Sequence, residues 1–233
     1  MAFEVEQCRK RTLASFEKGY TVVNLIAVIL FIALAAGITS QVVASLGDLE
    51  SKRFYSSLSD LEGKIYSYYE QNSRWPGDCN RNGLIEYHPE NVVSLASAKS
   101  NFASNEVAVD KTRCDVLGRN PETLDSPFSD LRHAALLERE STNRVVSKHT
   151  SGSFFQLGSA SAERNGKSVR VNAIVAYGVS AHVAKWVDHY VDGDVDGNRG
   201  RIRRWDIDDA GSAWPGPDDK SVALVYYFEK TLP

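Results

Sequence analysis

Residues 22–38 read VVNLIAVILFIALAAGI, and this run decides the fold prediction. Asn24 is its single polar member. A helix needs about 17–25 apolar residues to cross a bilayer, and it must be a helix because lipid offers the backbone no hydrogen-bond partners. Residues 22–38 are therefore predicted to form a transmembrane helix.

The charges on either side of this run predict its orientation. Basic residues at 9–11 precede it, whereas Asp48 and Glu50 follow it. Because positively charged flanks stay in the cytoplasm, the C-terminal part is expected outside it. The predicted location is the bacterial inner membrane, as a single-pass precursor with its C-terminal domain in the periplasm.

The helix is expected to continue beyond the apolar run, because no proline occurs between Tyr20 and Trp75. Its second half carries apolar residues at spacings of three and four, which is typical of one buried stripe on a soluble helix. A helix from about residue 20 to residue 70 would be about 75 Å long. The stripe consists of Phe54, Leu58, Leu61, Ile65 and Tyr68.

Residues 73–233 are predicted to form an α+β domain. Strands are expected at 154–160, 169–177 and 221–228, where β-branched and aromatic residues gather. Asn165-Gly166 is a hairpin signal between the first two strands. Helices are expected to begin at Asp125-Ser126-Pro127 and, with Ser180 as the cap, near residue 181.

The residues around the start of the apolar run resemble the type IV prepilin and pseudopilin family. The resemblance rests on a charged leader ending in Lys18-Gly19, then Tyr20-Thr21 and the apolar helix. It implies that a prepilin peptidase removes residues 1–19 by cutting between Gly19 and Tyr20, after which Tyr20 is methylated. It also implies a pilin-like fold, in which the long helix of residues 20–72 packs on a small antiparallel sheet.

The same resemblance implies a function and partners. The chain is expected to be a structural subunit of a type IV pilus or pilus-like filament, with other pilin or pseudopilin subunits and the inner membrane as partners. A pseudopilin of a type II secretion system is the first alternative. A membrane-anchored periplasmic enzyme or binding module is the alternative from another class.

Asn24 departs from the family pattern, because the fifth mature residue is usually Glu. That Glu is thought to pair with the N-terminal amine of a neighbouring subunit, and an unpaired buried charge is unfavourable. Asn cannot neutralise an ammonium group. We therefore expect a minor or tip-located subunit, with an adequate substitution in a divergent filament as the alternative.

The chain has three cysteines, and the implied cleavage removes Cys8. Cys79 and Cys114 would remain in the exported domain, where disulfides persist. We expect them to pair, closing a loop of about 35 residues that contributes about 3–4 kcal/mol in the chain-entropy treatment. Two buried free thiols are the alternative.

Two polar loops make calcium a candidate cofactor, because alternate oxygen ligands and a glycine resemble the first half of a calcium loop. Neither loop has Glu at its twelfth position, so Glu86, Asp206 or Asp208 would have to complete a site. A plain polar turn is the alternative. The candidate ligands are Asp192, Asp194 and Asp196 in one loop and Asp78, Asn80 and Asn82 in the other.

These two segments also resemble a pattern in some bacterial pilin-like proteins. There, a Pro-Gly-Asp motif follows the long helix, and a later helix ends in an Asp-rich turn before Gly-x-Ile. Here the motif is Trp75-Pro76-Gly77-Asp78, and the later segment runs from Val187-Asp188 to Gly200-Arg201-Ile202.

Enzyme and nucleic-acid functions are not expected. No phosphate-binding glycine motif is present, and the seven-residue spacing of His182 and His189 does not match a zinc site. The net charge is −3, which gives no reason to expect DNA binding. The basic run at 199–204 could contact phosphates, but it could equally balance the neighbouring aspartates.

Overall fold

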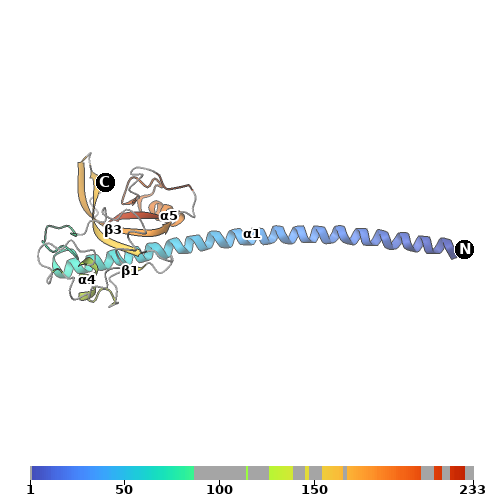
Figure 1. The fold of residues 1–233 in the computed structure, drawn as a ribbon, viewed down its shortest axis with the longest axis horizontal. Coiled ribbons are helices and arrows are strands. Elements are labelled where there is room, and N and C mark those ends of the chain that lie inside the picture. The colour runs from blue at the N-terminus through green and yellow to red at the C-terminus, as the bar shows by residue number, and fades with distance from the viewer. Residues whose placement is uncertain are drawn as a thin grey trace. The chain divides into compact units, whose positions relative to one another are not determined.

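The computed structural model describes residues 2–86, 114, 126–138, 145–146, 154–164, 167–205, 213–216 and 221–228. The chain divides into two units, Met1–Gly47 and Asp48–Pro233. Helix α1, Ala2–Asn72, contributes to both units (Figure 1).

The first unit carries an apolar band, residues 24–33, whose side chains are all exposed. Within the described residues, no helix is both long enough and apolar enough to span a membrane. The predicted fold with a transmembrane half at 22–38 is therefore wrong, and so is the predicted inner-membrane location.

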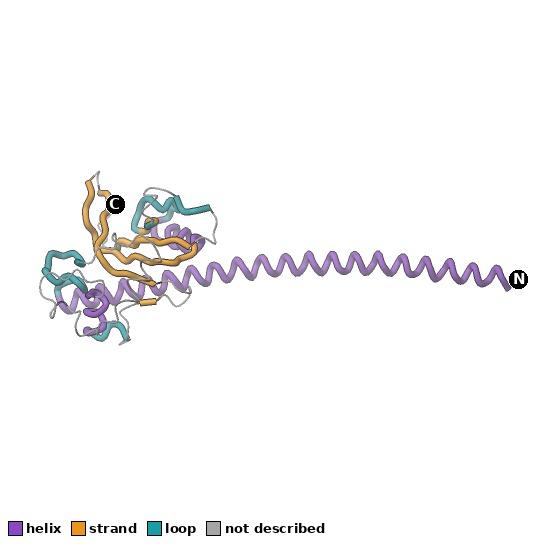
Figure 2. Tube along the Cα trace, viewed as in Figure 1, coloured by secondary structure: helices purple, strands orange, loops and turns teal. Residues whose placement is uncertain are grey.

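The second unit is built on a five-stranded antiparallel sheet of order β1-β2-β3-β5-β4. Its strands are coloured orange in Figure 2. The longest pairing joins β2 to β3, from Phe154 opposite Tyr177 to Arg164 opposite Lys167. The strands are β1, Val145–Val146; β2, Phe154–Arg164; β3, Lys167–Ser180; β4, Ile202–Arg204; and β5, Ser221–Tyr227.

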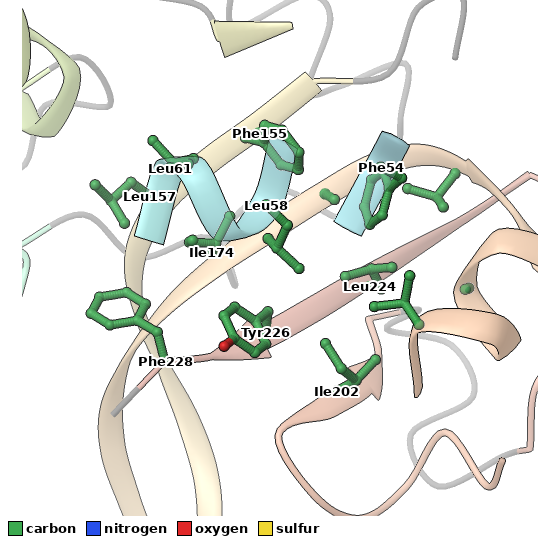
Figure 3. Packing of buried hydrophobic residues seen from close by; sticks show 14 of the residues in the cluster. Phe54, Leu58, Leu61, Phe155, Leu157, Ile174, Ile202, Leu224, Tyr226 and Phe228 are labelled. Carbon is green, nitrogen blue, oxygen red and sulfur yellow. The ribbon is translucent and has the colours of Figure 1, made fainter. Parts of the chain in front are cut away.

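The C-terminal part of α1 packs on one face of this sheet (Figure 3). Its apolar residues recur at spacings of three and four, so they form one stripe that faces the sheet. Phe54, Leu58 and Ile65 have no exposed surface. The ring of Phe54 lies 5.7 Å from that of Phe155 on β2, centroid to centroid. The stripe meets sheet residues Phe155, Leu157, Ile174, Ala176, Leu224 and Tyr226 in one core.

The opposite face of the sheet has a second apolar cluster. Alternation along the strands points Phe154, Val175 and Val225 away from α1, and all three are buried. Phe154 and Tyr177 stack with ring centroids 5.3 Å apart. Both faces of the sheet are therefore apolar near the middle of β3.

Two further helices complete the described part of the second unit: α4, Ser126–His133, and α5, Ala181–Asp192. Ser180 caps α5 as predicted, because its side chain accepts a hydrogen bond from the backbone N–H of Val183 at 3.3 Å. Gly193 ends α5 in the left-handed conformation at φ 85°.

The strands differ in detail from their predicted ranges. β2 and β3 extend beyond the predicted 154–160 and 169–177, because the register stays in phase along the whole hairpin. The predicted turn at Asn165-Gly166 lies outside the described residues. β1 and β4 were not predicted, since segments of two or three residues are too short to show an alternating pattern.

Candidate functional site

The exposed apolar band of α1 is the first candidate site. The exposed fractions are 62% for Leu25, 76% for Phe31 and 62% for Ile32, and the other large side chains of the band exceed half. A helix that is apolar all round is normally buried and not exposed to water. The predicted processing residues, Gly19 and Tyr20, lie in α1.

Asn24 lies on one face of this exposed band. The residues of this face recur at helical spacing. They are Asn24, Ala27, Val28, Phe31 and Ile32. This face combines a single amide with a small residue and with large apolar side chains.

In the second unit, a polar network fastens α1 to the sheet. Glu62 on α1 accepts hydrogen bonds from the Tyr226 hydroxyl at 2.7 Å and from Arg201 Nη2 at 3.2 Å. Arg201 Nη2 also donates to the Tyr226 hydroxyl oxygen at 2.6 Å, and its guanidinium lies over the Tyr226 ring. Burial, followed by the Glu62 carboxylate, raises the pKa of Tyr226 well above its usual value.

The predicted disulfide is confirmed: Cys79 and Cys114 are bonded, with Cα atoms 4.9 Å apart. Beside it, Asp130 of α4 is buried and accepts three hydrogen bonds. Its Oδ2 receives Arg74 Nη1 at 2.7 Å and the Gly77 N–H at 3.0 Å, while its Oδ1 receives the Cys114 N–H at 3.4 Å. Asp130 therefore joins α4 to both sides of the disulfide.

The Trp75-Pro76-Gly77-Asp78 motif begins just after α1 ends. Trp75 stacks on Tyr69 with ring centroids 4.3 Å apart and meets Phe228 edge-on at 5.5 Å. Gly77 has φ 79°, and a Cβ there would lie 2.7 Å from Pro127 Cγ of α4. The motif thus turns the chain sharply and holds it against α4, which is a structural role.

The first predicted calcium loop is held by its own side chains. Buried Asp78 accepts the N–H groups of Asn82 at 3.0 Å and Gly83 at 3.1 Å. Asn80 accepts the Asn82 N–H at 2.9 Å, and Asn82 accepts the Leu84 N–H at 2.8 Å. All three predicted ligand side chains therefore bind backbone N–H groups of their own loop.

A residue that sequence reasoning missed joins this loop to the sheet. Asn172 on β3 donates from Nδ2 to the Gly83 carbonyl at 2.9 Å and accepts the Ile85 N–H at 2.8 Å. Asn172 has no exposed surface. An Asn inside a run of β-branched residues was the one available signal, because a buried amide requires partners.

The second predicted calcium loop follows α5. Asp192 accepts the N–H groups of Arg201 at 3.0 Å and Ile202 at 2.8 Å, one on each carboxylate oxygen. Gly200 has φ 76°, and a Cβ there would clash with the Asp192 carboxylate. The Asp192 carboxylate therefore fixes the backbone where the loop ends and β4 begins.

The other two predicted ligands of this loop differ from each other. Asp196 Oδ1 accepts the N–H groups of Asn198 at 2.8 Å and Arg199 at 2.9 Å. The Asp194 side chain is exposed. Asp192 and Asp196 thus act as turn-forming side chains in this geometry.

Asp188 is the acidic residue of this region that sequence reasoning did not select as a ligand. It is 1% exposed and accepts the Trp214 indole N–H at 2.6 Å and the Gly197 N–H at 3.1 Å, both on Oδ2. Burial raises the pKa of Asp188 to about 6, with smaller contributions from the nearby Asp192 and Asp196 carboxylates, whereas the two hydrogen bonds lower it.

No group of three or more His, Cys, Asp or Glu side chains in the described part of the chain is arranged to hold a metal ion. Of the proposed completing ligands, Asp206 and Asp208 lie outside the described residues, and Glu86 is half-buried near the first loop. Calcium therefore stays a prediction from the sequence.

No protein family, no curated protein and no solved structure matches the chain.

Proposed function

We propose that this chain is a structural subunit of a type IV pilus or a pilus-like filament, made from a precursor that prepilin peptidase cuts between Gly19 and Tyr20. The observation that carries the proposal is the apolar band at 24–33, which is exposed on every side of its helix. Large exposed apolar surfaces mark interaction sites, and a surface contributed by other protein subunits is one of these.

The contrast between the two parts of α1 supports this reading. The stripe from Phe54 to Tyr68 is covered by the chain's own sheet and is almost fully buried. The band at 24–33 belongs to the other unit, and its large side chains stay more than half exposed. The same helix of a neighbouring subunit carries an identical apolar surface. A filament places many such helices close together, so they can cover one another.

The role that follows is assembly without a catalytic step. The apolar band packs among the helices of neighbouring subunits, and burial of its area stabilises the filament. The second unit is held rigid by the disulfide, by the Asp130 hydrogen bonds and by the Glu62 network. The minor or tip location inferred from Asn24 stays a prediction, which the amount of this chain in purified filaments would test.

Cleavage is the first test. We would co-express the full chain with an active prepilin peptidase and determine the mature N-terminus by mass spectrometry. We expect a chain that begins at Tyr20 only when the peptidase is active. A matched Gly19→Leu variant should keep its leader, because a bulky side chain replaces the small residue at the cut. An intact wild-type leader beside a processed control prepilin would contradict the proposal.

Assembly is the second test. Phe31→Asp places a charge in the apolar band and should remove the chain from the sheared filament fraction, because burying an unpaired carboxylate is strongly unfavourable. Val195→Asp is a matched control, since Val195 is also exposed but lies in the loop after α5. Loss of incorporation in both variants, or in neither, would contradict the role of the band.

A further inference from the structure

Asp130 of α4 binds the chain on both sides of the Cys79–Cys114 disulfide, and it does so through backbone N–H groups. Its Oδ2 accepts the N–H of Gly77 at 3.0 Å, and its Oδ1 accepts the N–H of Cys114 itself at 3.4 Å. Asp130 is 3% exposed, and Arg74 Nη1, 2.7 Å from Oδ2, supplies the opposite charge that a buried carboxylate requires. One buried carboxylate therefore holds the two arms of the loop that the disulfide closes.

The contact between α4 and the first arm is fixed by shape as well as by hydrogen bonding. Gly77 has φ 79°, and a Cβ there would lie 2.7 Å from Pro127 Cγ at the start of α4. Only glycine fits this close approach without strain. The Cα atoms of Cys79 and Cys114 are 4.9 Å apart, so the arms that Asp130 holds are already at the separation that a disulfide needs.

Two contacts that close the same loop strengthen each other. Cys79 and Cys114 are 35 residues apart, and closing a free loop of that length is entropically unfavourable. Where Asp130 already holds both arms, the two thiols meet at a high effective concentration. Where the disulfide is already present, Asp130 binds two arms that cannot separate. Such coupling is reciprocal, so each contact stabilises the other by the same factor.

We propose that Asp130 is a positioning residue for the oxidation of Cys79 and Cys114, so that docking of α4 and closure of the loop form one redox-dependent step. The oxidant is a disulfide, for which oxidised glutathione is the probe. One cysteine thiolate attacks a glutathione sulfur and releases one glutathione; the second cysteine thiolate then attacks the mixed disulfide and releases the other. Two cysteine thiols are oxidised, one glutathione disulfide is reduced to two thiols, and the two protons pass to the released glutathione.

The consequence is a redox-sensitive contact within the second unit. Reduction of the disulfide weakens the hold of Asp130 on both arms, so α4 is joined less firmly to the chain that follows α1. An oxidising compartment, where disulfides persist, favours the joined form. The proposal uses residues of the second unit alone, so it stands or falls independently of the filament function.

The test uses the full chain with Cys8→Ser, equilibrated with mixtures of reduced and oxidised glutathione. Asp130→Asn keeps the size of the side chain but replaces one acceptor oxygen with an N–H₂ group, so it can hold only one arm at a time. Asp188→Asn is the matched control, because Asp188 is also a buried carboxylate of the second unit, and its hydrogen bond to the Gly197 N–H lies in the loop after α5.

We expect Asp130→Asn to lower the effective concentration of the two thiols in the folded chain by about tenfold, which raises the reduction potential by about 30 mV. Asp188→Asn should leave the equilibrium unchanged. In a denaturant the parent chain and both variants should agree, because Asp130 holds neither arm once the chain is unfolded. Equal native values for the parent chain and Asp130→Asn would overturn the proposal. A shift of the same size in Asp188→Asn, or a shift that persists in denaturant, would overturn it too.

A second measurement starts from the oxidised chain, so it does not require reduced Asp130→Asn to fold. Reduced glutathione attacks the disulfide and leaves a mixed disulfide on one cysteine, and the thiol of the other cysteine closes the bond again. Without the Asp130 carboxylate the arms separate more readily. Acid-trapped mixed disulfide, counted by mass spectrometry, should therefore be several-fold more abundant in Asp130→Asn than in the parent chain or Asp188→Asn. Equal amounts in the three chains would contradict the positioning role.

Discussion

The Tyr226 hydroxyl donates a 2.7 Å hydrogen bond to the carboxylate of Glu62, across 164 residues of sequence. This bond joins the final strand of the sheet to the long helix. Arg201 binds both groups, so the carboxylate, the hydroxyl and the guanidinium are partners of one another beside a largely apolar interface. The network therefore fixes the position of α1 on the sheet. Apolar packing alone would specify this position less precisely.

Tyr226→Phe tests this network, because it removes only the hydroxyl group. The substitution leaves Glu62 and Arg201 without one partner each, and we expect the free energy of unfolding to fall by about 1–3 kcal/mol. Chemical denaturation at neutral pH, followed by circular dichroism, would measure the change.

The matched control is Asp60→Asn on the same helix. Asp60 pairs with Lys64 at 2.6 Å, but the Asp60 side chain is 63% exposed. Exposed ion pairs contribute about 0.2–1 kcal/mol, so the control should change stability little. If Tyr226→Phe and Asp60→Asn lowered the free energy of unfolding equally, the buried network would contribute no more to stability than an exposed ion pair.

The apolar pattern explains why some contacts could be predicted from the sequence. The buried stripe of α1 follows from spacings of three and four, and the cap at Ser180 follows from residue type and position. The Cys79–Cys114 bond followed from counting cysteines once the leader was set aside. Each of these inferences uses local spacing or a small number of possible partners.

Long-range polar pairs could not be predicted in this way. The pairing of Glu62 with Arg201 spans 139 residues, and either residue would be normal on a solvated surface. The hydrogen bonds by which Asp78 and Asp192 hold their own loops could likewise not be predicted, because a calcium loop and an Asx turn use the same residue types. Only the positions of the backbone N–H groups separate the two cases.

The disulfide should be a main source of stability in the second unit. Replacing both Cys79 and Cys114 with Ser should lower the free energy of unfolding by about 2–4 kcal/mol, because the unfolded chain regains the freedom of a closed loop. Reduction of the wild-type chain should have the same effect. The Cys8→Ser variant serves as the control. If the double variant unfolded at the wild-type denaturant concentration, the disulfide would have no stabilising role.

Calcium binding at the two acidic loops is testable by heating. If the sequence prediction holds, calcium raises the melting temperature of the wild-type chain and a chelator lowers it, because a ligand that binds only the folded state stabilises that state. Asp194→Ala should reduce the response, since Asp194 is exposed and its substitution removes a candidate ligand without disturbing a buried contact. A wild-type melting temperature that responds to neither addition contradicts the prediction.

Asp188 should make stability depend on pH in the acid range. Its pKa is raised from 3.8 to about 6 by burial, so the folded chain binds a proton more tightly than the unfolded chain does. Stability from this group is present at low pH and is lost as the pH rises from about 4 to about 6. Relative to a variant without the charge, the wild-type chain should lose about 1–2 kcal/mol between pH 4.5 and pH 7.

Asp188→Asn is that variant, because its amide oxygen can still accept the N–H groups of Trp214 and Gly197. Measuring the free energy of unfolding of both chains at several pH values cancels the titration of all other groups to first order. The difference between the two chains should grow in favour of Asn as the pH rises and level off above about pH 6, where the folded-state carboxyl has ionised. A difference that stays constant with pH would show that Asp188 keeps an ordinary pKa, and that Trp214 and Gly197 compensate its burial in full.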